Sequence, residues 1–422
     1  MVNHFNKSNS QKKIVVAMDS FKGSLTSLEA GNAVRDGILE RYPDVDVQIF
    51  PVADGGEGTV EALTFGKEHV QTRTIPVTGP VGTEVSARYT IYEQAGEKTA
   101  VLEMAQAAGL PLVPEERRNP MHTTTYGVGE MIRDAITCGC QKFILGIGGS
   151  ATNDAGIGML QALGFHFMDE AGREVGYGAE GLAQVRSITT EKVMPELASC
   201  TFQIACDVTN PLVGAQGCSA VFAPQKGADA KMVQAMDVAM NRYADIVENT
   251  YRKNPALMEN QLTGYDEADR NVEKTDRQSY DKNRMTPGAG AAGGLGYACL
   301  MFLHAALKPG IDIVLDEIQI AQAIQTADAV ITGEGRFDAQ TLMGKTPIGV
   351  ARIAKSYEVP VYAFAGCFGA DVQVCIDSGV FAGCYAASAA STEEEKRLAM
   401  EKRHAYANLK ACVKSHFCTE NN

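Results

Sequence analysis

The sequence predicts an α/β protein with mainly parallel strands. Short runs of β-branched and other apolar residues, each of strand length, recur along the chain, and nearly every run leads into Gly, Asp or Ser. Helical patterns follow these polar loops. A strand, a polar glycine loop and a helix form the repeating unit of α/β proteins, in which ligands bind beyond the carboxyl ends of the strands. We therefore expect the functional residues in the loops that follow strands.

Six segments have the composition of buried strands: 13–17, 45–50, 142–147, 202–205, 329–331 and 359–365. A helix from about Ser27 to Arg41 should follow the first strand, because Thr26 and Glu29 have the spacing of a capping box. Alternating residues from about Thr74 to Leu102 predict antiparallel strands instead. A second subdomain is therefore expected to begin near Pro76.

Composition excludes several classes of function. A chain of 422 residues is long enough for about two or three domains. A net charge of -13 argues against nucleic acid as a partner, because binding to a phosphate backbone depends on clustered cations. No apolar stretch approaches the ~20 residues of a membrane-spanning helix, so no membrane partner is expected. Eleven Cys without a C-x-x-C pair, and no apolar leader, predict a cytoplasmic protein.

Two stretches interrupt the strand and helix order. Residues 251–286 carry seven Lys and Arg and seven Asp and Glu with few large aliphatic residues, which predicts a mobile surface loop. Residues 287–296 then read Pro-Gly-Ala-Gly-Ala-Ala-Gly-Gly-Leu-Gly. Glycine at this density indicates a close approach of the backbone, either to a helix or to a ligand.

One glycine loop, Gly148–Asp154, has features of an anion site. It lies between a predicted strand and a predicted helix, where unpaired N–H groups and the positive end of the helix dipole attract phosphate. A tight turn that needs glycine only for steric reasons is an equally good interpretation. The loop does not match the dinucleotide-binding G-x-G-x-x-G pattern, and no P-loop pattern occurs in the chain.

Acidic residues recur in or beside the loops at strand ends: Asp19, Asp54, Glu57, Asp207, Glu334 and Asp338. Singly, each could cap a helix or hold a turn. Together they match phosphoryl transfer from a magnesium nucleotide, which needs acids to hold Mg²⁺, one acid to accept a hydroxyl proton, and cations to neutralise the transferring group. Lys22, Arg336 and Lys345 supply such cations, unless they are ordinary solvated charges. Because the loops share one chemistry, we expect one site.

Two further kinds of polar residue have weaker signals. Ser20 and Ser150 lie outside a G-x-S-x-G motif, and no His occupies a comparable loop, which argues against a serine hydrolase. Asn210 could bond a substrate carboxylate or a phosphate oxygen, or could form a turn before Pro211.

The loops contain these motifs in order: Asp19–Ser24 (DSFKGS), Ala53–Thr59 (ADGGEGT), Gly148–Asp154 (GGSATND), Cys206–Leu212 (CDVTNPL), Pro287–Gly294 (PGAGAAGG) and Thr332–Thr341 (TGEGRFDAQT). In this order they resemble the motifs of the bacterial glycerate kinase family. The resemblance implies transfer of the γ-phosphoryl group of ATP to D-glycerate, in most members to the 2-hydroxyl. It also implies a Rossmann-like domain built from both ends of the chain, an inserted α/β domain, and an active site in the interdomain cleft. Ala155–Gly156 stands where the family often has paired glycines.

The expected organisation is a disordered tail at 1–12, a Rossmann-like domain of residues 13–75 and 288–418, and an inserted domain of residues 76–287. ATP and Mg²⁺ are the expected cofactors, and the chemistry of the loops suggests the following roles: Asp54, Asp207 and Lys22 for catalysis; Gly148, Gly149, Ser150, Asn153, Asp154, Gly333, Gly335 and Lys345 for ATP; Asp19, Ser20, Asn210 and Arg336 for glycerate; Glu334 and Asp338 for Mg²⁺. A kinase for another small hydroxy acid, a 3-phosphoglycerate-forming enzyme and a non-catalytic organic-acid sensor are the alternatives. The oligomeric state, a homo-oligomer included, is left open.

Overall fold

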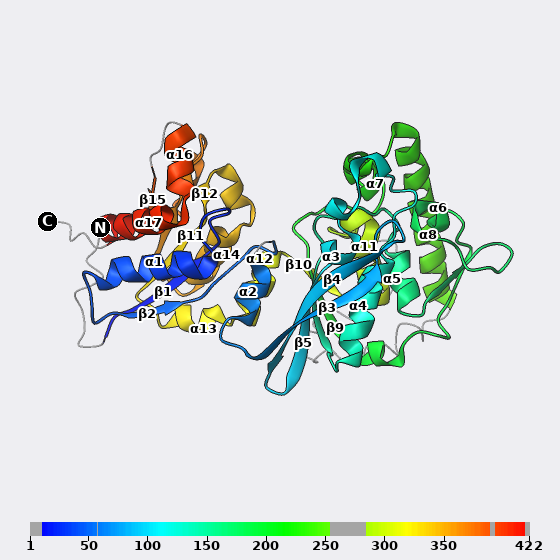
Figure 1. The fold of residues 1–422 in the computed structure, drawn as a ribbon, viewed down its shortest axis with the longest axis horizontal. Coiled ribbons are helices and arrows are strands. Elements are labelled where there is room, and N and C mark those ends of the chain that lie inside the picture. The colour runs from blue at the N-terminus through cyan, green and yellow to red at the C-terminus, as the bar shows by residue number, and fades with distance from the viewer. Residues whose placement is uncertain (1–10, 57, 254–283, 389–392, 418–422) are drawn as a thin grey trace. The chain divides into compact units, whose positions relative to one another are not determined.

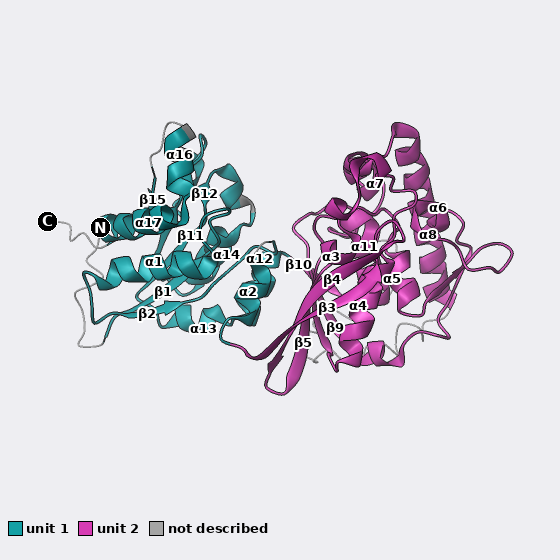
Figure 2. Ribbon diagram, viewed as in Figure 1, with its two compact units in different colours: residues 1–66, 309–422 teal, residues 67–308 magenta. Residues whose placement is uncertain are grey.

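The computed structural model describes residues 11–56, 58–253, 284–388 and 393–417. The chain divides into two compact units (Figures 1 and 2): unit 1 comes from both ends of the chain, residues 1–66 and 309–422, and unit 2 is residues 67–308. Both units combine parallel strands with helices, which confirms the predicted α/β class. Among the described residues, no helix is both long enough and apolar enough to cross a membrane.

Unit 1 is built on a five-stranded parallel sheet of order β15-β13-β11-β1-β2. Its strands are β1 (Lys13–Met18), β2 (Asp46–Ile49), β11 (Ala329–Gly333), β13 (Val361–Ala365) and β15 (Gly383–Ala386), with β12 (Arg336–Phe337) and β14 (Cys367–Phe368) as a separate parallel pair. The order changes direction between β1 and β11, as in doubly wound sheets.

Helices cover both faces of this sheet (Figure 1). Along β1, Val16 packs in the cluster that contains α1 and α17, whereas Val15 packs in the cluster that contains α12, α13 and α14. Apolar residues on both faces are what a buried parallel strand requires. The helices are α1 (Ser27–Leu39), α2 (Thr59–Thr64), α12 (Gly310–Glu317), α13 (Ile320–Gln325), η6 (Ala339–Met343), α14 (Thr346–Ser356), α15 (Gln373–Asp377), α16 (Glu393–Met400) and α17 (Lys402–His416).

Unit 2 has a six-stranded mixed sheet of order β10-β9-β6-β5-β4-β3. β3 (Glu68–Thr78), β4 (Glu84–Gln94) and β5 (Glu97–Glu103) are antiparallel, as predicted, and β5, β6 (Lys142–Gly146), β9 (Thr201–Ala205) and β10 (Ala306–Lys308) are parallel. The other elements are the antiparallel pair of β7 (His166–Met168) and β8 (Ser187–Thr189), and α3 (Ala105–Ala108), η1 (Leu110–Leu112), η2 (Glu115–Arg117), α4 (Tyr126–Thr137), α5 (Ile157–Ala162), α6 (Gly178–Leu182), η3 (Pro195–Ser199), α7 (Cys218–Phe222), η4 (Pro224–Lys226), α8 (Ala230–Lys253) and α11 (Ala291–Phe302).

The unit boundaries differ from the expected domain boundaries at both ends. Residues 67–75 belong to unit 2, not to the Rossmann-like domain, because β3 pairs with β4 from Glu68 onward. Residues 288–308 also belong to unit 2, because α11 contributes to its core and β10 pairs with β9. A glycine run has no apolar period that could show which sheet it joins.

The expected tail and loop are partly ordered. Lys12 forms an ion pair with Asp328 at 3.1 Å, so the tail does not extend to residue 12, and residues 1–10 lie outside the described part. Helix α8 continues to Lys253, and Arg284 forms an ion pair with Glu248 at 2.8 Å. Residues 251–253 and 284–286 of the expected loop are therefore ordered, and residues 254–283 lie outside the described part.

Candidate functional site

One group of predicted residues lies where the strand order of unit 1 reverses. β1 and β11 are neighbours, yet the following strands β2 and β13 lie on opposite sides of them. Asp19 follows β1 and Glu334 follows β11, and the Asp19 N–H donates to the Gly333 carbonyl at 2.9 Å. Ligands of doubly wound sheets bind at this switch point. The fold thus places two predicted acids at the expected position.

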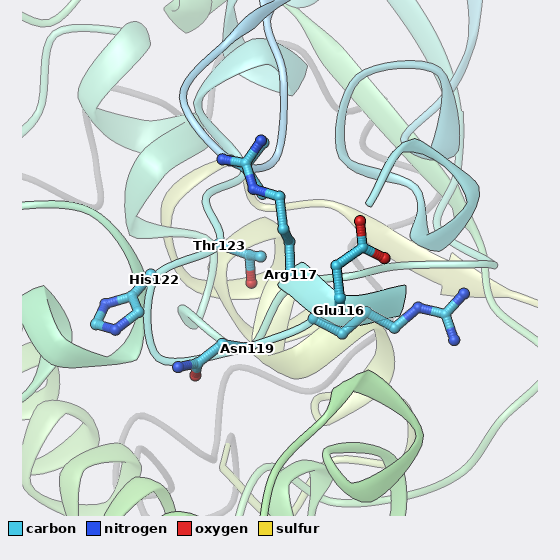
Figure 3. A pocket seen from close by; sticks show the side chains of 7 residues that line it. Glu116, Arg117, Asn119, His122 and Thr123 are labelled. Carbon is cyan, nitrogen blue, oxygen red and sulfur yellow. The ribbon is translucent and has the colours of Figure 1, made fainter. Parts of the chain in front are cut away.

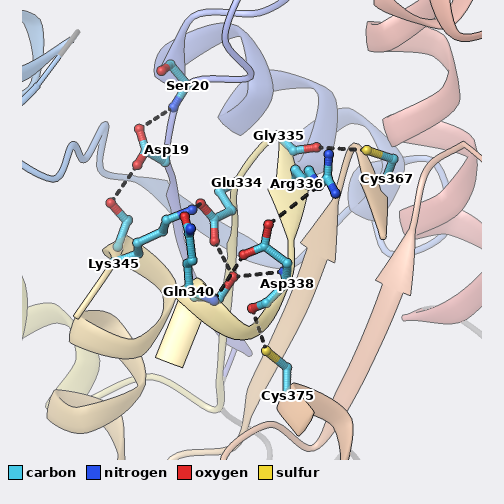
Figure 4. Close-up of polar contacts among 12 residues, drawn as sticks. Asp19, Ser20, Glu334, Gly335, Arg336, Asp338, Gln340, Lys345, Cys367 and Cys375 are labelled. Atoms are coloured by element: carbon cyan, nitrogen blue, oxygen red, sulfur yellow. Dashed lines mark hydrogen bonds and ion pairs between the residues drawn. The ribbon is translucent and has the colours of Figure 1, made fainter. Parts of the chain in front are cut away.

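Asp19 is a buried carboxyl group with two hydrogen-bond donors (Figure 4). Its Oδ1 accepts from the Ser20 N–H at 2.6 Å, and its Oδ2 accepts from the Thr346 hydroxyl at 2.7 Å. Burial raises the pKa of Asp19 to about 7. The Thr346 and Ser20 hydrogen bonds oppose this rise, whereas the charges of Asp54 and Glu334 add to it. Asp19 therefore titrates near neutral pH, and a nearby cation would favour its ionised form.

Glu334 is the second buried acid of this group, with 7% of its surface exposed. Its Oε1 accepts from the Thr341 hydroxyl at 2.7 Å, and its Oε2 lies 3.3 Å from Lys345 Nζ. Burial raises the pKa of Glu334, Thr341 and Lys345 lower it, and Asp338 raises it. Lys345 thus already partners an acid, and its binding of ATP stays a prediction.

Asp338 caps the short helix η6 in the same group (Figure 4). Its Oδ1 accepts from the Gln340 N–H at 3.0 Å, and its Oδ2 lies 3.4 Å from Arg336 Nε. The Arg336 side chain is 65% exposed, so this ion pair adds little stability. The capping role that the sequence left open is present, and the Mg²⁺ role of Asp338 stays a prediction.

Three other predicted residues of unit 1 are less constrained. Asp54 lies near enough to raise the pKa of Asp19, and its Oδ1 accepts from the Gly56 N–H at 3.3 Å. The Ser20 hydroxyl is buried without a hydrogen-bond partner among the described residues. Lys22 is exposed, and Glu57 lies outside the described part.

The second group lies in the glycine loop of unit 2, where Gly148 and Gly149 are exposed. The Ser150 hydroxyl accepts a hydrogen bond from Lys226 Nζ at 2.7 Å, and Lys226 also donates to the Thr152 carbonyl at 2.6 Å. Lys226 is 2% exposed. Burial lowers its pKa to about 8, and Cys218 and Asp154 partly offset this. Lys226 takes part in no ion pair within the described part of the chain, so a buried cation with neutral hydrogen-bond partners lies against this loop.

Asn153 and Asp154 are fully buried, and their side chains hold the loop itself. Asn153 Nδ2 donates to Ser219 Oγ at 2.9 Å. Asp154 Oδ2 accepts from both the N–H and the hydroxyl of Thr125, each at 2.9 Å. Burial raises the pKa of Asp154, and the hydrogen bonds from Thr125 and Gly156 lower it.

The glycine run at 287–296 lies against the chain's own loops. A Cβ on Gly293 would lie 2.1 Å from the Thr152 carbonyl oxygen, and a Cβ on Gly290 would lie 2.1 Å from the Pro211 carbonyl oxygen. The predicted close backbone approach is present, but its partners are the loops after β6 and β9, whereas a helix or a ligand was expected.

Asp207 and Asn210 lie in the loop after β9, the strand beside β6. Asp207 is exposed. Asn210 Nδ2 donates to the Gln216 carbonyl at 2.9 Å, as expected of the turn-forming alternative. The role of Asn210 in binding glycerate stays a prediction.

The structure thus gathers the predicted residues into two groups, one in each unit, and the single shared site stays a prediction. Sequence reasoning missed Thr341, Thr346 and Lys226. The two threonines adjoin predicted loops and could have been included as hydroxyl donors. Lys226 is 76 residues from Ser150 and lies in no motif, so the sequence carried no signal for it.

Comparisons with known proteins agree on one family. Residues 14–417 match the sequence model of the glycerate kinase family. A glycerate kinase of Haemophilus influenzae is 45% identical over 87% of this chain and 89% of its own length, and the glycerate 2-kinase of Escherichia coli K12 is 43% identical over 87% and 88%. A glycerate kinase 2 crystal structure from Salmonella typhimurium LT2 is similar in fold, with a TM-score of 0.78 and 39% identity over 97% of this chain and 100% of that one.

Proposed function

The chain belongs to the glycerate kinase family, and from this premise we propose that it transfers the γ-phosphoryl group of ATP to the 2-hydroxyl of D-glycerate. The sequence similarity carries this proposal, because more than one relative named as a glycerate kinase matches along most of the chain. The glycerate 2-kinase of Escherichia coli supports the choice of the 2-hydroxyl. A non-catalytic sensor is not supported, since several relatives are named as glycerate kinases.

Mg²⁺ fits the acids of unit 1. Asp54 and Glu334 lie close enough to Asp19 for their negative charges to raise its pKa. A divalent cation beside the three acids would offset the repulsion among them. Among the described residues, no three potential ligands are already arranged around one point. Mg²⁺ is commonly held by one or two carboxylates together with substrate phosphates, so we expect Glu334 and Asp338 to bind it only with ATP. The ion would neutralise charge on the transferring group.

The remaining residues bind, orient and move a proton. Glycerate offers a carboxylate and two hydroxyl groups, and one hydroxyl must be presented in line with the γ-phosphate. We propose Asp54 or Asp207 as the acceptor of the hydroxyl proton, and Lys22 and Arg336 as cations that balance charge. The Gly148–Asp154 loop is proposed to bind a phosphate group or the glycerate carboxylate.

A coupled assay of ATP consumption tests the substrate. We expect turnover with D-glycerate and much less with L-glycerate, tartronate and glycolate. A clear preference for one of the other three acids would contradict D-glycerate as the substrate and identify that acid instead. Phosphorus NMR of the product then separates 2-phosphoglycerate from 3-phosphoglycerate, and a 3-phosphoglycerate signal would contradict the proposed hydroxyl.

Two matched variants identify the base. Asp54→Asn and Asp207→Asn each keep the shape of the side chain and remove its basicity. We expect one of them to abolish turnover while the midpoint of thermal unfolding stays near that of the wild type. Near-normal kcat in Asp207→Asn would exclude Asp207 from the mechanism, and near-normal kcat in both would exclude the proposed base.

A further inference from the structure

A cavity of about 430 Å³ in unit 2 contains none of the residues assigned above (Figure 3). Its lining residues are mainly polar, and cations outnumber acids among them: Val81, Glu116, Arg117, Arg118, Asn119, His122 and Thr123. Polar pockets with a few fixed charges are typical of sites for small charged ligands. The sign of the lining charge favours an anion.

The two arginines of this cavity have no acidic partner. Within the described part of the chain, neither Arg117 nor Arg118 forms an ion pair. Arg118 Nε is buried without any hydrogen-bond acceptor among the described residues, and a buried donor without an acceptor carries a free-energy cost. An acceptor oxygen supplied by a ligand would remove that cost. His122, by contrast, lies 3.2 Å from Glu180.

Two contacts connect the cavity wall with neighbouring segments, one with the glycine loop and one with the residue that follows Lys226. The Thr123 hydroxyl donates to the Ala151 carbonyl at 2.9 Å. Gly227 lies so close to Arg118 that a Cβ there would be 2.1 Å from the Arg118 carbonyl oxygen. Ala151 follows Ser150 and Gly227 follows Lys226, the pair that forms the buried hydrogen bond of this loop. The backbone on both sides of Arg118 and Thr123 is therefore held by contacts with neighbouring segments, which favours a preformed cavity.

We propose that this cavity binds an oxyanion, a phosphate or a carboxylate group, through Arg117 and Arg118. A guanidinium group presents paired N–H donors that match both kinds of oxyanion. Glu116 would repel an anion, and the two arginine charges would outweigh this repulsion. ATP, glycerate and phosphoglycerate carry such groups. The choice among these three ligands rests on the proposed function, whereas the binding of an oxyanion by the cavity does not.

Equilibrium binding tests the proposal without turnover. The dissociation constants of metal-free ATP, 2-phosphoglycerate and D-glycerate are measured by calorimetry at one salt concentration for the wild type, Arg117→Gln and Arg118→Gln. We expect each variant to weaken at least one probe by at least ~10-fold, because a hydrogen bond to a charged group is lost. Weakening of the two phosphate compounds only identifies a phosphate site, and weakening of D-glycerate identifies a carboxylate site.

Control variants keep the test decisive. Arg173→Gln removes an arginine whose side chain is 79% exposed and paired with Asp169, and it should leave every dissociation constant within about twofold of the wild type. Arg118→Lys keeps the positive charge but removes the paired N–H donors of the guanidinium group, and it should weaken binding less than Arg118→Gln does. If Arg118→Gln does not fold, the dissociation constants of Arg117→Gln decide the test, because Arg117 is exposed. The proposal is wrong if the wild type binds no probe, or if both Gln variants bind all three as the wild type does. Absent turnover would reject only the proposed function.

Discussion

The two units bury different sets of charged groups at their candidate loops. In unit 1, Asp19 and Glu334 are buried acids, and the pKa of Asp19 is raised by burial and by its acidic neighbours. In unit 2, Lys226 is a buried cation whose hydrogen-bond partners are a hydroxyl and a carbonyl oxygen. Asp154, a fully buried acid of the same loop, partly offsets the effect of burial on the pKa of Lys226, and a buried charge without a partner is costly in either unit. This difference motivates our proposals that the acids of unit 1 bind a cation and that the loop of unit 2 binds an anion.

The largest expected effect is on the pH dependence of stability. The pKa of Asp19 is about 7 in the folded chain against 3.8 as the ordinary value, so the folded state retains a proton that the unfolded state loses. Stability from this group is complete below pH 4 and is lost as the pH rises through 7. Asp19→Asn cannot ionise, so we expect it to be more stable than the wild type by up to roughly 4 kcal/mol above pH 7. Urea unfolding from pH 4 to 8 in EDTA measures this.

Asp44→Asn is the control for that experiment, because Asp44 is an exposed acid of the same unit. Its stability should follow the pH profile of the wild type. If the stability of Asp19→Asn depends on pH as that of the wild type does, Asp19 does not carry a buried charge in solution. The contrast between the units would then not hold for unit 1.

The next effect concerns the backbone beneath the loop of unit 2. In Gly293→Ala, the new Cβ would lie 2.1 Å from the Thr152 carbonyl oxygen at a φ of 67°. We expect a loss of about 3 kcal/mol from overpacking and left-handed strain together, measured by urea unfolding. Gly148→Ala, in the loop against which Gly293 packs, is the control, because a Cβ on Gly148 would meet nothing within 4 Å. Equal stability of the two variants would contradict the close approach.

Removal of the buried cation should act mainly on catalysis. Lys226→Met keeps the length of the side chain and removes the ammonium group that holds Ser150. If the loop binds an anionic group of a substrate, kcat/KM should fall by about 100-fold, equivalent to about 2.7 kcal/mol. The KM values for ATP and D-glycerate show which substrate is affected. Lys231→Met, at an exposed position of α8, should behave as the wild type, and a Lys226→Met enzyme with unchanged kcat/KM would remove the anionic half of the comparison.

These contrasts were only partly predictable from sequence, and the reason is locality. The cap of α1 by Thr26 and Glu29 depends on residues three apart, and the predicted capping box is present. The strands β1 and β11 were predictable because buried parallel strands are continuously apolar. The acids that follow them were predicted to be functional because ligands bind beyond the carboxyl ends of such strands. Lys226 was missed because its contact with Ser150 exists only after folding. Residues 288–308 were assigned to the wrong unit because a glycine run lacks a hydrophobic period.

The smallest expected effect is at Ala155, which has a φ of 50° and no exposed surface. Ala155→Gly relieves left-handed strain of about 1 kcal/mol, but it loses about 0.8 kcal/mol of methyl burial and increases the entropy of the unfolded chain by a similar amount. The net loss should therefore stay below about 1 kcal/mol in urea unfolding. Since the methyl group is buried, kcat/KM should also stay within about threefold of the wild type. A larger fall in kcat/KM at unchanged stability would show that the methyl group shapes the loop, and that backbone contacts alone do not set its geometry.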